Sequence, residues 1–189
     1  MLSVLLELQR LKRLDRTGWV LRGLPPGAES VAAHSYGVAL TAMLLADECA
    51  ARGVGVDVGR VLRIALLHDL QETRTGDMPR TVADYYGRDA RRAAERAAFD
   101  DVMRGAGGAA LYAELHEDYE SRASLEARLV KAADVIDLLA QALAFERAGS
   151  RGLAEFWEGA EGRDFGLEGE AREVVREAVA ALVAERSRQ

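Results

Sequence analysis

Four side chains that commonly bind metal ions lie in apolar surroundings in this sequence. His34 is within one apolar segment, His68 and Asp69 end a second, and Asp134 is within a third. A buried imidazole or carboxylate is costly without a partner. A divalent ion is one such partner, because neutral imidazole and carboxylate ligands together suit Mn, Fe, Co, Ni and Zn. These residues are therefore candidate metal ligands.

Two histidines and two aspartates would leave coordination positions open for water. A divalent ion with an open position lowers the pKa of its water and polarises a phosphoryl oxygen, which prepares a hydrolytic reaction. Chance remains an alternative, since a His-Asp dipeptide arises often and a helical histidine is usually just hydrogen-bonded in the core.

The elements that carry these residues are predicted to be helices. Apolar residues recur at helical spacing, and the alternation typical of strands is missing, so we predict an all-α fold. Ser30 and Asp57 are in position to cap the helices that carry His34 and His68. The predicted helices span about 2–14, 30–52, 57–71, 88–104, 109–121, 124–147 and 168–187.

Composition excludes several classes of function. The 189 residues suit one domain, and 49% are hydrophobic, which is enough for a core. A net charge of -6 argues against nonspecific nucleic-acid binding. No leader pattern or apolar run of membrane-spanning length is seen, and the single cysteine, Cys49, cannot form an internal disulfide. We expect a cytoplasmic protein that binds neither membranes nor nucleic acid.

The ordered set of histidines and aspartates resembles the HD-domain superfamily of metal-dependent phosphohydrolases. It is most similar to the 5′-deoxynucleotidase branch, which contains bacterial deoxyribonucleoside monophosphatases and their eukaryotic relatives. The resemblance extends from about residue 5 to about residue 158. Its motifs are Leu-Lys-Arg-Leu-Asp-Arg-Thr-Gly-Trp at 11–19, Glu-Ser-Val-Ala-Ala-His-Ser at 29–35, Leu-Leu-His-Asp-Leu-Gln-Glu at 66–72, Thr-Gly-Asp at 75–77 and Lys-Ala-Ala-Asp at 131–134.

The resemblance implies a single-domain HD-type helical bundle with its metal site between central helices. Residues 1–158 would form the phosphohydrolase core. Beyond the resemblance, the apolar pattern of residues 159–189 predicts a linker and an amphipathic helix that packs on the core or at a subunit interface. A homodimer is implied, as is one divalent ion, Mn, Co, Zn, Ni or Fe, with four ligands: His34, His68, Asp69 and Asp134.

The resemblance also implies an acid/base pair, Glu72 and Asp77. Glu72 follows His68 by four residues, so it would share a helical face with this ligand if the helix extends that far. Asp77 follows a break at Gly76. For either carboxylate alone, a solvated surface side chain is the simpler interpretation.

Three further residues are candidates for substrate binding: Arg16, Trp19 and Lys131. Arg16 offers a planar fork for a phosphate, and Trp19 an aromatic face for a sugar or base. A structural tryptophan between helices and an ion pair of Lys131 with Asp134 are the alternatives. His116 lies in a charged stretch, and we expect it to be exposed or half-buried and outside the site.

The expected activity is hydrolysis of nucleoside 5′-monophosphates, particularly deoxyribonucleotides, to nucleoside and phosphate. An HD phosphohydrolase or phosphodiesterase that acts on another nucleotide is the first alternative. A noncatalytic helical protein with a structural metal is the second, although such a protein would not need Glu72 and Asp77. Only three histidines are present, which favours one metal over two.

Overall fold

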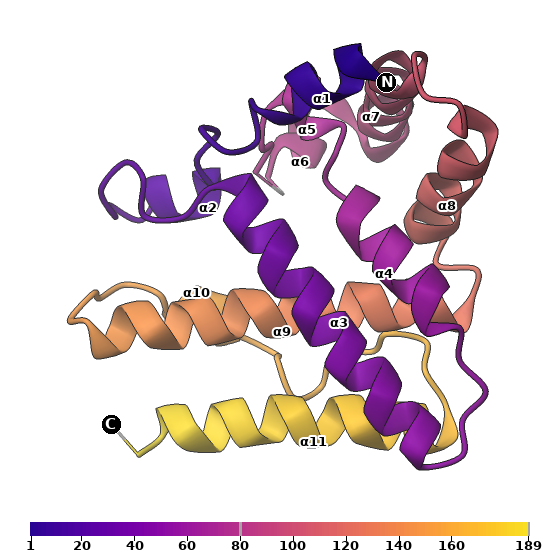
Figure 1. Ribbon diagram of the computed structural model, residues 1–189. Coiled ribbons are helices and arrows are strands. Elements are labelled where there is room, and N and C mark those ends of the chain that lie inside the picture. Colours follow the sequence, from indigo (N-terminus) through magenta and orange to yellow (C-terminus); the bar gives the residue numbers. More distant parts are fainter. Residues whose placement is uncertain (80, 189) are drawn as a thin grey trace. The chain divides into compact units, whose positions relative to one another are not determined.

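The chain folds into α-helices, as a computed structural model of residues 1–79 and 81–188 shows (Figure 1). These described residues contain no β-strand, only an isolated antiparallel bridge between Asp15 and Ser30. The helices are α1 (Leu2–Leu8), α2 (Thr17–Val20), α3 (Val31–Ala51), α4 (Val58–Leu67), α5 (Glu72–Thr75), α6 (Val82–Tyr86), α7 (Arg88–Met103), α8 (Ala109–Ser121), α9 (Leu125–Arg147), α10 (Ala154–Trp157) and α11 (Gly169–Arg186).

Five predicted helices, now α3, α7, α8, α9 and α11, begin and end within one residue of their expected bounds. Two predicted bounds were wrong. The helix expected over 2–14 ends at Leu8, and the one expected over 57–71 ends at Leu67, where a turn leads into α5. The four short helices, α2, α5, α6 and α10, were not predicted, because four or five residues contain too little of a helical repeat to be recognised.

Side-chain caps fix the starts of the helices that carry the candidate ligands. The Ser30 hydroxyl accepts a hydrogen bond from the Ala33 N–H (3.1 Å), and Asp57 accepts one from the Arg60 N–H (2.9 Å). Ser124 accepts one from the Ala127 N–H (3.0 Å) at the start of α9. Each bond satisfies a backbone donor that has no partner inside its helix, so the predicted capping roles of Ser30 and Asp57 are confirmed.

The described chain divides into two units that are interleaved in sequence. The first contains residues 1–35 and 66–117, and the second contains residues 36–65 and the chain from 118 onward. In the first unit, α1, α5 and α6 all contact α7. Its buried cluster consists of Val4, Leu11, Val31, Leu70, Phe99, Val102 and Met103.

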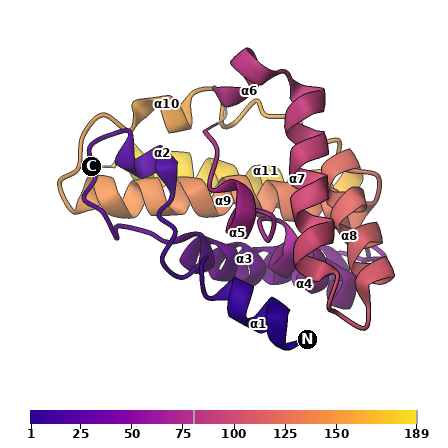
Figure 2. The same cartoon turned by 90° about the horizontal axis from the view of Figure 1, so that it is seen from above.

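In the second unit, α11 packs along α9, and Figures 1 and 2 show the two helices side by side. Arg186 of α11 forms two 2.9 Å hydrogen bonds with Glu146 of α9, and its guanidinium lies 4.8 Å from the centre of the Trp157 ring. The C-terminal helix therefore supports the helix that carries Asp134. The division at residue 158 stays a prediction.

A close approach of α3 and α9 in the second unit requires a glycine. A Cβ atom at Gly37 would lie 2.1 Å from Oδ1 of Asp137. This distance is far inside van der Waals contact, so any larger side chain would displace the carboxylate. Among the helices of the described chain, none is both long enough and apolar enough to cross a membrane.

Candidate metal centre

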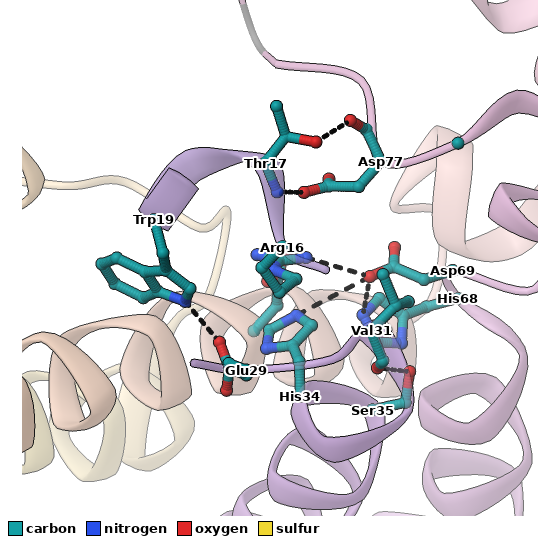
Figure 3. A network of polar contacts seen from close by, with 12 residues as sticks. Arg16, Thr17, Trp19, Glu29, Val31, His34, Ser35, His68, Asp69 and Asp77 are labelled. Atoms are coloured by element: carbon teal, nitrogen blue, oxygen red, sulfur yellow. Dashed lines mark hydrogen bonds and ion pairs between the residues drawn. The ribbon is translucent and has the colours of Figure 1, made fainter. Parts of the chain in front are cut away.

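Two histidines and an aspartate meet in the first unit. His34 lies on the first turn of α3, and His68 and Asp69 follow directly after α4. Both imidazoles are 1% exposed, and their Nε2 atoms lie 3.7 Å (His34) and 3.1 Å (His68) from the same oxygen, Oδ2 of Asp69. Figure 3 shows the three side chains pointing toward one another. Three of the four predicted ligands are thus brought together.

The Asp69 carboxylate is held in its charged form. Burial favours the neutral acid, but the charge and hydrogen bond of His68 oppose this effect. His34 and Arg16 add positive charge, and together these groups hold the pKa of Asp69 well below its usual range. Arg16 Nη1 lies 3.3 Å from Asp69 Oδ2. The site therefore presents a carboxylate, the form that binds a cation.

The donor set fits a first-row divalent ion. A ring nitrogen of His34 lies within 4.8 Å of a ring nitrogen of His68, close enough for one ion to contact both. Imidazole nitrogen together with carboxylate oxygen is the combination that Mn, Fe, Co, Ni and Zn share, and it does not distinguish among them. His34, His68 and Asp69 are thus the residues of the first unit that could hold an ion.

Asp134, the fourth predicted ligand, lies on α9 in the second unit. Its Oδ2 accepts a 2.7 Å hydrogen bond from Lys131 Nζ, one helical turn earlier, and a 3.2 Å bond from the hydroxyl of Tyr119. The ion pair is the alternative that we gave for Lys131. Asp134 stays a predicted ligand, and a contact of Lys131 with substrate also stays a prediction.

Glu72 does not share a helix with His68. Helix α4 ends at Leu67, and Glu72 is the first residue of α5, so the condition for a common helical face is not met. The turn at 68–71 and the short α5 nevertheless keep Glu72 near the ligands in sequence and bury it to 8% exposure. Glu72 is therefore not the solvated surface carboxylate of the alternative interpretation.

Asp77 follows a sharp reversal of the chain at Gly76, which has φ of 75° and ψ of 164°. This conformation is essentially limited to glycine. After the turn, the Asp77 carboxylate accepts a 2.5 Å hydrogen bond from the Thr17 N–H, and the Thr17 hydroxyl donates to the Asp77 carbonyl (2.7 Å; Figure 3). Asp77 is thereby fixed beside Arg16, the neighbour of Thr17 in sequence.

Trp19 is almost entirely buried, with 1% of its surface exposed. Its indole N–H donates a 2.5 Å hydrogen bond to the Glu29 carboxylate, which is itself buried (Figure 3). This environment supports the structural alternative for Trp19. A contact with substrate would require the ring to become exposed, and it stays a prediction.

Sequence analysis missed Thr17, Glu29 and Tyr119 as partners of predicted site residues. Glu29 and Thr17 lie within the motifs quoted above, but Tyr119 lies outside all of them, and no local pattern identifies its partner. The exposure expected for His116 was wrong. It is 3% exposed and stacks on Phe99 with the ring centres 4.1 Å apart, a contact between two helices that its charged sequence neighbours conceal.

Comparisons with known proteins agree with this geometry. The HD-domain family model matches residues 8–160. The zebrafish (Danio rerio) protein named 5′-deoxynucleotidase HDDC2 is 33% identical over 172 residues, 86% of this chain and 79% of that protein. The Saccharomyces cerevisiae protein named 5′-deoxynucleotidase YGK1 is 33% identical over 166 residues, 82% of this chain and 72% of that protein.

A solved structure has a similar fold. A conserved hypothetical protein from Pyrococcus furiosus has a TM-score of 0.80 and 34% identity, and the match covers 97% of this chain and 99% of that one. The match therefore covers more of the chain than the family model, which ends at residue 160.

Proposed function

The chain belongs to the HD-domain family, and from this premise we propose that it hydrolyses deoxyribonucleoside 5′-monophosphates to nucleoside and phosphate with one divalent metal ion. The proposal has one principal structural support. Two buried imidazole nitrogens face a single oxygen of a charged carboxylate. The names of the zebrafish and yeast relatives support the substrate class.

We propose His34, His68, Asp69 and Asp134 as the metal ligands. When bound, a divalent ion would supply Lewis-acid chemistry, polarising a phosphoryl oxygen and making water more acidic. Which of Mn, Co, Zn, Ni or Fe the protein uses is left to experiment, because the donor set suits all of them.

Glu72 and Asp77 are proposed to move the protons. Glu72 orients the attacking water and accepts its proton, while the water oxygen forms a bond to phosphorus. The bond from phosphorus to the 5′-oxygen breaks, and the proton taken from water is returned to that oxygen through Asp77, so that the nucleoside leaves neutral. Since the Thr17 bonds fix Asp77, it can act without a large loop movement.

Arg16 is proposed to bind the phosphate. Its guanidinium has a fork of donors suited to phosphate oxygens. It is already placed against Asp69 at 3.3 Å, so a phosphate there would lie next to the proposed ligands. Trp19 and Lys131 are the weaker substrate candidates, because Trp19 is buried and Lys131 is paired with Asp134.

We also propose that the chain forms a homodimer in the cytoplasm. Helix α3 exposes three large apolar side chains at successive turns: Tyr36 (71%), Leu40 (42%) and Leu44 (58%). Such an exposed apolar stripe on a long helix is a suitable contact for a second copy. Sedimentation of the wild type and of a Tyr36→Glu, Leu44→Glu double variant tests this, since only the wild type should sediment as a dimer.

The activity is tested by removing metal with a chelator and reloading the protein separately with Mn, Co, Zn, Ni and Fe. Phosphate release is then measured from matched ribo- and deoxyribonucleoside monophosphates. Asp69→Ala should abolish release, whereas Asp47→Ala, at an exposed position of α3, should not. Hydrolysis of a cyclic or longer nucleotide alone, followed by chromatography of the nucleotide products because opening a cyclic phosphodiester releases no inorganic phosphate, would support the alternative phosphohydrolase. Metal binding without any hydrolysis would support the structural alternative.

A further inference from the structure

We propose that Tyr119 is a positioning residue that orients the carboxylate of Asp134 for metal binding. This inference rests on the proposed function, because it takes Asp134 to be a metal ligand. The Tyr119 hydroxyl donates to Asp134 Oδ2 at 3.2 Å, and Tyr119 is 7% exposed. The sequence alone predicted no role for Tyr119.

The backbone that carries Tyr119 is fixed by its neighbour Asp118. One Asp118 oxygen accepts from the Ser124 N–H (2.9 Å), and the other accepts from the Ser124 hydroxyl (2.8 Å) and from Arg60 (2.6 Å). Burial opposes the charged form of Asp118, but the Arg60 and Ser124 bonds outweigh it and lower its pKa. The end of α8 is thereby tied to the start of α9.

The turn between these helices is held from its other side by Arg128. This side chain donates to the carbonyl of Arg122 (2.9 Å) and to that of Ala123 (3.0 Å). Arg122 has a φ of 55°, a left-handed conformation that costs energy in a residue other than glycine and persists where surrounding contacts impose it. These bonds fix the backbone of the turn that follows Tyr119 in sequence.

Tyr119 and Lys131 both donate to the same Asp134 oxygen but differ in charge. The two bonds together fix the plane of the carboxylate, since one donor comes from α8 and the other from the preceding turn of α9. The phenol is neutral at pH 7, so it orients the carboxylate without bringing a charge that repels a cation. Donors that orient a ligand in this way typically contribute a factor of about 10 to 100 in metal affinity.

The test is calorimetric titration of the metal-free protein with Co²⁺. The wild type is compared with Tyr119→Phe, with Asp134→Ala and with the control variant Tyr85→Phe. Tyr85 is 87% exposed, so its variant should bind like the wild type. Tyr119→Phe keeps the ring and removes only the hydroxyl. We expect its Kd to rise about 10- to 100-fold, and we expect no further weakening when Tyr119→Phe is added to Asp134→Ala.

The outcomes separate this inference from the proposed function. Wild-type affinity in Tyr119→Phe, with binding weakened but still measurable in Asp134→Ala, would overturn the role of Tyr119 and leave the proposed function standing. Equal weakening by Tyr119→Phe in both backgrounds would also overturn it, because a general structural role would then explain the effect. Full affinity in Asp134→Ala would remove Asp134 from the ligand set and the inference with it.

Discussion

Thr17 and Asp77 form a reciprocal pair of hydrogen bonds across 60 residues of sequence. The Thr17 N–H donates to the Asp77 carboxylate at 2.5 Å, and the Thr17 hydroxyl donates to the Asp77 carbonyl at 2.7 Å. The preceding residue, Arg16, contacts Asp69. Arg16 and Thr17, at the start of α2, thus contact a proposed metal ligand and a proposed catalytic carboxylate. Both contacts lie within the first unit.

Thr17→Val tests whether this pair positions Asp77. The substitution keeps the backbone N–H and the branched shape but removes the hydroxyl donor. We expect kcat to fall about tenfold, because small displacements of a catalytic group have large effects on rate. Metal content and KM should change little. Thr17→Ser retains the hydroxyl and should restore the rate, so a Ser variant as slow as the Val variant would contradict the role of the hydroxyl.

Glu72→Gln and Asp77→Asn test the proposed proton transfers. Each amide keeps the size of the side chain but cannot exchange a proton, so kcat should fall by roughly 10²–10⁴. Metal analysis of the same samples should give the wild-type content. If either variant loses its metal instead, that carboxylate is a ligand or a structural support. Glu161→Gln, at an exposed position, is the matched control.

Trp19→Phe separates a structural tryptophan from one that binds substrate. The variant removes a buried bond to a charged acceptor, Glu29, so the free energy of unfolding should fall by roughly 2–3 kcal/mol. Glu29→Gln should weaken the same bond, and the double variant should lose less than the sum of the two. A raised KM with unchanged stability would instead assign Trp19 to substrate binding.

We expect His116 to make the free energy of unfolding depend on pH. Burial lowers its pKa from 6.5 to about 4, against the raising effects of Asp100 and Glu117. Below pH 6.5 the unfolded chain takes up a proton that the folded chain does not, so stability falls until the pH approaches 4. Above pH 6.5 the imidazole is neutral in both states and contributes no pH dependence.

The measurement is the unfolding temperature of the chelated protein at pH 7.5 and pH 5.0, for the wild type and for His116→Phe. The phenyl ring preserves the stacking on Phe99 but does not titrate. We expect the wild type to lose several degrees more than the variant over this range. Equal losses would show that His116 does not govern the acid sensitivity.

The sequence was sufficient for the long helices, because each extends over several turns of a regular apolar pattern. It was insufficient where a helix ends without a proline, a glycine or another local signal in the sequence. Helix α4 stops at Leu67 and the chain turns before Glu72, although the residues 68–71 contain no proline or glycine that would predict the break. The condition for a common helical face of His68 and Glu72, one continuous helix, is therefore not met.

The chemistry-bearing residues could be proposed from the sequence, but their partners could not. The pairs Thr17 with Asp77 and Tyr119 with Asp134 join residues that are 60 and 15 positions apart, and neither separation follows a helical repeat within one element. The burial of His116 could not be predicted from its neighbours in sequence either. Its neighbours in sequence are charged, whereas its actual environment is set by Phe99 on another helix.

The most direct test of the metal-dependent site is a stoichiometric Co²⁺ titration of the metal-free protein, after the chelator has been removed. Bound metal and phosphate release from deoxyadenosine monophosphate are followed in the same samples. We predict that activity rises in proportion to bound metal and saturates at one ion per chain, and that His34→Ala, His68→Ala and Asp69→Ala neither bind nor react. Full activity in the chelated protein, or wild-type binding and turnover in Asp69→Ala, would contradict the account.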